Sequence, residues 1–167
     1  MTDLLLRPAL THALAARLSN GARINLTAAH GLGRRQTLAD LRSILPKNMR
    51  VLYADMKFCL NDFPATLHEL CTQTGLPDAT VSELGQLIEV LAQDSQPTLL
   101  ILHNLDLLRA APHDALFDTA LLPFLAHIAA HPHLALLTVS EAVYPNWPLP
   151  CENIALPPQN GAIPSLE

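Results

Sequence analysis

Between residues 23 and 41, the chain contains a short apolar run, a glycine-containing turn and a segment with leucines at helical spacing. The apolar run ends at Ala28, and the turn contains Gly31 and Gly33. A loop that leads into a helix N-terminus directs backbone N–H groups and the positive end of the helix dipole toward one place. His30 in the loop and Arg34 at the start of the helix add side-chain donors. These residues predict a site for an anion such as phosphate.

Two further apolar runs are each followed by polar residues. His103, Asn104 and Asp106 come after the run 98–102, and Ser140 ends the run 134–140. Continuous apolar runs of this length are typical of strands that are buried on both faces of a parallel sheet. Ser140 is followed by Glu141 and has no Gly-x-Ser-x-Gly setting, so a hydrolase nucleophile is not predicted there.

Three histidines lie near the end of a predicted helix over residues 114–130. His127 and His131 are one helical turn apart, as a metal pair would be, and His133 follows them. No acidic or cysteine partner is adjacent, and the helix dipole favours histidine near a helix C-terminus without any metal. We therefore predict no metal site.

The glycine turn resembles the Walker A loop of P-loop ATPases, and more narrowly that of the AAA+ and STAND families, whose pattern is G-x-x-x-x-G-K-[ST]. On this pattern Ala28 and Gly33 stand at the two glycines, Arg34 at the lysine, and Arg35 at the serine or threonine. In the family the lysine reaches the terminal phosphates and the hydroxyl binds magnesium. Arg34 can still pair with phosphate, whereas Arg35 cannot bind a cation and Thr37 lies two residues too late.

The resemblance therefore implies a degenerate phosphate-binding loop, whose binding residues would be His30, Gly31, Gly33, Arg34 and Arg35. The alternative is an ordinary strand-to-helix turn, in which the two glycines only supply backbone geometry.

The run 99–106 resembles the Walker B strand of the same families. His103 stands where the magnesium-binding aspartate would be, Asn104 stands at the catalytic acid, and Ser140 falls at the sensor position. Asp106 is the carboxylate that could compensate, although aspartate is also common as a helix cap at such a turn. The resemblance thus implies a degenerate Walker B motif, a sensor-like serine and no catalytic residue. Arg109 follows this motif too closely to be predicted as an arginine finger.

The composition indicates a soluble globular protein of one domain. The chain has 167 residues, of which 50% are hydrophobic, and no apolar run approaches the length of a membrane span. The three cysteines show no metal or redox spacing and predict reduced thiols, so we expect a cytoplasmic protein. Residues 1–57 hold nine basic and three acidic residues, a net charge of +6, whereas the remainder holds one basic and twelve acidic residues, a net charge of −11. This asymmetry favours head-to-tail self-assembly or an anionic partner.

Predicted strands and helices alternate along the chain. We expect strands near residues 24–28, 50–55, 98–103 and 134–140 and a short last strand at 153–156. The expected helices cover residues 8–18, from about 34 to before 46, 67–74, 81–92 and 114–130, the last interrupted by Pro123. This order predicts an α/β fold, a three-layer α/β/α sandwich with a central parallel sheet. The resemblance adds that the fourth strand should separate the first from the third. In the family a helical lid follows the fifth strand, but only about ten residues remain after Pro157, so no lid is expected here. A single domain is expected over 1–167, with an N-terminal helix in 1–22 and a proline-rich tail over 151–167.

Taken together, the residues favour a P-loop ATPase-like domain that has lost hydrolysis and acts as a protein-assembly or scaffold module with retained phosphate affinity. One alternative is a nucleotide-binding ATPase switch with an unusual site, for which ATP or ADP would be the ligand. Another is a DNA-associated AAA+-type subunit that uses its basic half. A protein partner or self-association is expected. Specific nucleic-acid readout is not supported by the few aromatic residues, and neither a bound metal nor a membrane is expected.

Overall fold

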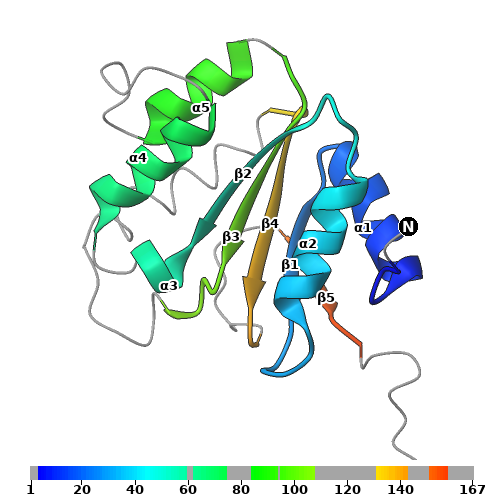
Figure 1. The fold of residues 1–167 in the computed structure, drawn as a ribbon. Helices are drawn as coiled ribbons and strands as arrows, with labels where there is room; N and C mark the ends of the chain where they lie inside the picture. The colour runs from blue at the N-terminus through cyan, green and yellow to red at the C-terminus, as the bar shows by residue number, and fades with distance from the viewer. Residues whose placement is uncertain are drawn as a thin grey trace, which may run out of the picture.

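The protein forms a five-stranded parallel sheet (Figure 1). The computed structural model describes residues 4–59, 62–74, 84–93, 95–107, 131–142 and 151–157. Its strands are β1 (Arg23–Thr27), β2 (Arg50–Asp55), β3 (Thr98–His103), β4 (Leu134–Ser140) and β5 (Glu152–Ala155). They lie in the order β2-β3-β4-β1-β5, and every pair is parallel. The prediction that the fourth strand separates the first from the third is confirmed.

The two central strands explain why the sheet is parallel and covered. Every residue of β3 and β4 is buried, as the continuous apolar runs predicted. Parallel strands need crossover connections, and described helices lie between β1 and β2 and between β2 and β3 along the chain. The carboxyl ends of the strands therefore meet at one edge, where Asp55 is paired in register with His103, and Thr27 with Ser140.

Five helices are described: α1 (Pro8–Ser19), α2 (Arg34–Ile44), α3 (Met56–Cys59), α4 (Phe63–Thr74) and α5 (Leu84–Gln93). Figure 1 shows α2 in front of β1 with α1 beside it, while α4 and α5 lie on the side of β2 that faces away from β3. Within these described segments, no helix is long and apolar enough to cross a membrane.

Alternation along the strands decides which side chains face α1 and α2. Ile24 and Leu26 of β1 join the apolar core beneath these helices, as do Leu99 and Ile101 of β3. Because successive strand residues point to opposite faces, His103 lies on the same face as Ile101. Likewise Tyr53 packs against this core, and Asp55 follows two residues later on the same face.

Strand β2 forms one edge of the sheet, and α4 protects that edge. The side-chain amide of Gln73 accepts a hydrogen bond from the Tyr53 backbone N–H at 2.6 Å and donates to the Tyr53 carbonyl at 2.8 Å. A neighbouring strand would otherwise use these two groups. The edge is therefore closed at its centre by a side chain.

The predicted elements differ from the structure mainly at their ends. Helix α4 begins at Phe63 rather than residue 67, because Asp62 caps its first turn by accepting from the Ala65 N–H at 2.9 Å. Strand β5 is one residue earlier than predicted, since its register is set by β1. The short helix α3 was not predicted. The predicted helix over 114–130, with Pro123 and His127, lies outside the described residues, as does Arg109.

We predict that Gln73→Ala lowers the free energy of unfolding by about 1–2 kcal/mol, because both hydrogen bonds to the Tyr53 backbone are lost. Alanine keeps the helix propensity of α4 high, so the loss reports on the edge contact. Urea unfolding should show a lower midpoint with an unchanged slope. Gln93→Ala, at an exposed site near the end of α5, is the control, and an equal loss in both variants would contradict the prediction.

Candidate anion site at the carboxyl edge of the sheet

The glycine loop leads directly from β1 into α2. Its first residue is fixed by a hydrogen bond from the Ala28 N–H to the Ser140 carbonyl at 2.9 Å. Gly31 and Gly33 have φ angles of +83° and +76°, a conformation that glycine adopts without strain. Gly33 is the N-cap of α2, with no side-chain cap and no acidic residue in the first turn. The N–H groups of that turn therefore have no capping side chain and no carboxylate within the turn itself to accept from them.

A buried arginine holds the loop from behind. Arg7 is only 2% exposed, and its guanidinium donates to the Leu32 carbonyl in the loop at 2.7 Å. It also donates to the Thr37 hydroxyl of α2 at 3.1 Å and to the Pro157 carbonyl at 2.8 Å. Arg7 thereby links the loop, the helix that follows it and the segment after β5. Thr37 is thus part of the scaffold behind the loop.

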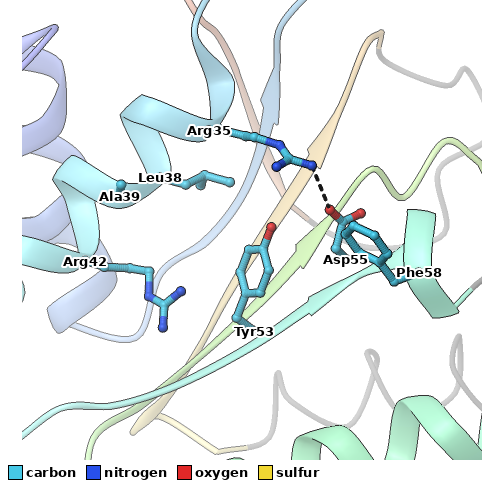
Figure 2. Close-up of a pocket in the computed structure, with 7 residues that line it drawn as sticks. All are labelled: Arg35, Leu38, Ala39, Arg42, Tyr53, Asp55 and Phe58. Carbon is cyan, nitrogen blue, oxygen red and sulfur yellow. Dashed lines mark ion pairs between the residues drawn. The ribbon is translucent and has the colours of Figure 1, made fainter.

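Asp55, at the end of β2, is the centre of a polar network beside the loop. Its Oδ1 accepts from the Asn104 side-chain amide at 2.8 Å and from the Lys57 backbone N–H at 2.9 Å. Its Oδ2 lies 3.9 Å from Arg35 Nη2, the contact drawn in Figure 2. The same oxygen is 3.8 Å from His103 Nδ1. A buried carboxylate requires partners of this kind.

His103 is held neutral within this network. Burial lowers its pKa, the negative charge of Asp55 opposes that shift, and the charges of Arg34 and Arg35 reinforce it. Burial, helped by Asp55, also raises the pKa of Tyr53, so its hydroxyl keeps its proton. The Tyr53 hydroxyl lies 2.8 Å from His103 Nδ1, and we assign it as the donor. The neutral imidazole then carries its own proton on Nε2.

Three buried polar atoms near the loop have no partner among the described residues: Arg34 Nη1, His103 Nε2 and Asp106 Oδ1. His103 is 2% exposed, so its Nε2–H is a buried donor without an acceptor. Such groups cost free energy unless a ligand or water satisfies them. Two of the three, Arg34 Nη1 and His103 Nε2, are donors. The charge of Arg34 acts on His103, and both donors fit an anion.

The structure brings together most of the predicted site residues. Arg34 Nη2 lies 3.4 Å from His30 Nδ1, and His30 Nε2 lies 2.5 Å from the Glu141 carboxylate. His103 and Asn104 both reach Asp55. The backbone of Asn104 has φ +58°, which asparagine tolerates better than most residues.

Ser140 has a different environment from the other predicted residues. Its hydroxyl lies 3.3 Å from Asn25 Oδ1 and 3.2 Å from the Ala142 carbonyl. Thr138 also donates to Asn25 Oδ1 at 3.0 Å, and Asn25 donates to Asn153 at 3.0 Å. Asn25 alternates with Ile24 and Leu26, so this cluster lies on the face of the sheet opposite His103.

The donors at this edge do not fit a magnesium ion. Magnesium prefers oxygen ligands in octahedral geometry. On the Walker A alignment Arg35 stands at the hydroxyl position, and its guanidinium lies 3.9 Å from Asp55. On the Walker B alignment the neutral His103 stands at the carboxylate position. Neither side chain offers an oxygen ligand to a cation.

Sequence reasoning missed Asp55, the centre of the network, and Arg7, which holds the loop. Asp55 ends a strand next to β3 in the sheet, so an acid at the end of a predicted strand was an available signal. Arg7 had no such signal, because its partners come from three segments far apart in the chain.

No family model and no curated protein matches the sequence. Solved structures do resemble it. Cdc6p from Pyrobaculum aerophilum has a TM-score of 0.67 and 19% identity, over 93% of this chain and 46% of that chain. Drosophila ORC bound to DNA has a TM-score of 0.59 and 17% identity, over 92% and 43%. A Walker-type ATPase of Pyrococcus abyssi has a TM-score of 0.65 and 13% identity, over 92% and 54%.

These neighbours are AAA+ P-loop ATPases, so the chain has an AAA+-like core fold, as its sequence indicated. At identities below 20% the similarity concerns the fold alone. The chain spans about half the length of the structures that it resembles.

The network predicts a specific dependence of stability on pH. Because the pKa of His103 is lowered on folding, the folded protein binds fewer protons there than the unfolded chain. The stability from neutral His103 is fully present above an unfolded pKa of about 6.5, and it is lost as the pH falls from there toward the lowered folded pKa.

His103→Asn should therefore flatten the decline in unfolding free energy between pH 7 and 5, by at most about 1.4 kcal/mol per pH unit. Urea unfolding at several pH values measures this slope. His12→Asn, which removes an exposed imidazole from α1, is the control. A slope that is the same in His103→Asn as in the wild type would contradict the assignment.

Proposed function

We propose that this protein is a P-loop ATPase-like module that does not hydrolyse ATP, retains an anion site in its glycine loop and acts in protein assembly. The observation that carries the proposal is the pair Arg35 and His103. On the Walker alignment these two residues stand where a hydroxyl and a carboxylate would hold magnesium. Arg35 lies 3.9 Å and His103 lies 3.8 Å from Asp55 Oδ2. The AAA+-like fold supports this interpretation of their positions.

Loss of hydrolysis follows from the chemistry of phosphoryl transfer. The metal ion bridges the terminal phosphates and neutralises charge that develops in the transition state, and a polar residue orients the attacking water. Each such contribution is typically worth several kcal/mol of barrier. Here the Asn104 amide donates to Asp55, which leaves it committed to the protein.

Retained anion binding is supported by the groups that remain. The first turn of α2 offers backbone N–H groups, Arg34 offers a partnerless Nη1, and His103 offers Nε2–H. All of these are donors, and none depends on a divalent cation. A phosphate would satisfy the buried donors that otherwise cost stability.

A role in assembly is supported by the distribution of charge. The basic residues are concentrated before residue 58, and Arg34, Arg35 and Arg42 all lie on α2. An exposed cluster of one sign attracts a partner of the opposite sign. The nucleotide-binding switch remains the alternative if ATP is found to bind and to be hydrolysed.

We predict no ATP turnover in the presence of magnesium. Phosphate release, followed with a coupled assay, should equal that of a buffer blank at every protein concentration. Release above the blank that is abolished in folded Arg34→Ala would contradict the proposal and favour the switch.

We also predict that anion binding does not require a metal. Calorimetric titration with inorganic phosphate or ATP should give the same affinity in EDTA as in magnesium. Arg34→Ala should weaken binding about 10-fold or more, because a hydrogen bond to a charged group is worth about 1.5–3 kcal/mol. Lys47→Ala, an exposed charge outside the loop, serves as the matched control. Binding that appears only with magnesium would contradict the prediction.

A further inference from the structure

A pocket of about 280 Å³ opens beside the loop, between α2 and the end of β2. It is lined by Leu38 and Ala39 of α2 and by Tyr53 of β2. Figure 2 shows the side chains of Arg35 and Arg42 extending from α2 toward Tyr53 and Asp55, with Phe58 on the far side. The lining combines apolar surface with two guanidinium groups.

The positive charge of this pocket is not cancelled within it. Asp55 is the one carboxylate among the lining residues, and its side chain is 5% exposed and already engaged by Asn104 and the Lys57 N–H. Arg35 is 70% exposed, and its contact with Asp55 is 3.9 Å long. Contacts of that length on an exposed side chain contribute little. Arg42 adds a second exposed charge, so the rim has a net positive charge toward solvent.

Phe58, which also lines the pocket, is an exposed aromatic side chain. Its exposed fraction is 77%, and among the described residues only Leu4 is another large hydrophobic side chain so exposed. An exposed aromatic ring beside cationic residues is typical of a contact surface, because such rings dominate the energetics of interfaces.

The neighbouring strand edge does not accept a further strand at this point. The backbone N–H and carbonyl of Tyr53 are both occupied by Gln73. A partner must therefore be recognised by its side chains inserted into the pocket rather than by backbone pairing along β2.

We propose that this pocket binds an acidic segment of a separate protein. An apolar side chain of the segment enters between Leu38 and Phe58, and carboxylates next to it pair with Arg35 and Arg42. Arginine suits this role, because its planar guanidinium pairs with a carboxylate through two hydrogen bonds. This inference rests on the proposed role in assembly and adds to it the chemistry of the partner.

Most of the described acids of this chain are already engaged, which makes a second copy a poorer occupant. The exceptions are Asp106, whose Oδ1 has no partner among the described residues, and Glu89, which is exposed on α5. Glu141 pairs with His30, Glu152 with Arg17, and Glu69 accepts from Gln73 at 3.1 Å. Asp62 caps α4, and Asp40 is a buried residue of α2 that accepts from the Leu6 N–H at 2.8 Å. These carboxylates already have partners within their own molecule.

Single-stranded nucleic acid is also less favoured. Base stacking needs an open aromatic face, but the Arg42 guanidinium lies over the Tyr53 ring, 5.4 Å from its centroid. The Tyr53 hydroxyl is bound to His103 at 2.8 Å. This leaves Phe58 as a single ring, which is a small platform for bases.

Fluorescence anisotropy with labelled hexapeptides tests the proposal. The probes place two leucines or two phenylalanines between pairs of glutamates, and the comparison peptides replace the apolar pair by serines or the glutamates by lysines. We expect binding of the acidic apolar peptides alone. Arg42→Glu should weaken it at least 10-fold, and Phe58→Ala about 5-fold.

Two matched variants control for non-specific effects. Lys47→Glu makes the same charge change as Arg42→Glu at an exposed residue outside the pocket, and Leu4→Ala removes the other exposed large hydrophobic side chain. Both should bind the peptides within twofold of the wild type. Equal weakening by Lys47→Glu and Arg42→Glu would show a diffuse charge effect and overturn the proposal.

Three further results would also overturn the proposal. The first is no binding of any acidic apolar peptide. The second is tighter binding of a labelled oligothymidine that is lost in the same variants, and the third is concentration-dependent dimerisation in sedimentation that Arg42→Glu abolishes.

Phosphate titration of Arg42→Glu separates this inference from the proposed function, because Arg42 lies outside the loop. Intact phosphate binding without peptide binding would reject the pocket alone.

Discussion

The carboxyl edge of the sheet is arranged around one buried negative charge. A carboxylate that is removed from water is costly unless hydrogen bonds and opposite charge compensate it. Asp55 obtains this compensation chiefly from hydrogen bonds with the Asn104 amide and the Lys57 N–H, and the exposed guanidinium of Arg35 adds a weaker contact at 3.9 Å. Its charge also sets the environment of His103, whose Nδ1 accepts from Tyr53. The polar side chains at this edge of the sheet are thus engaged in satisfying the protein itself.

The loop depends on a second buried charge, that of Arg7. Its guanidinium joins the loop at Leu32, helix α2 at Thr37 and the segment after β5 at Pro157. Removing one partner of a buried charged network is usually far more damaging than replacing the whole. The loop is therefore held in shape by the protein whether or not an anion is bound. A preorganised loop lowers the ordering cost of binding a small ligand.

The sequence predicted the elements that have strong periodicity or continuous burial. The apolar runs of β3 and β4 and the glycine loop before α2 were recognised because local residue patterns set them. The polar network around Asp55 was harder to predict from the sequence. Asp55 and Asn104 meet only because β2 pairs with β3, a contact 49 residues apart in the chain. The opposite orientation of Ser140 likewise follows from strand register, since one residue of shift changes the face. Arg7, whose partners span 150 residues, could not be assigned from a local pattern.

Arg35 belongs to both of the proposed sites, and this has a thermodynamic consequence. It follows Arg34 at the start of α2, it pairs with Asp55, and it lines the pocket that contains Arg42 and Phe58. An anion in the loop would draw on the same positive charge that a carboxylate in the pocket would use. Two ligands that share a charge weaken each other, and the effect is reciprocal by linkage. A single guanidinium connects the two proposed sites. If both sites are occupied as proposed, phosphate would change the affinity of the domain for its partner.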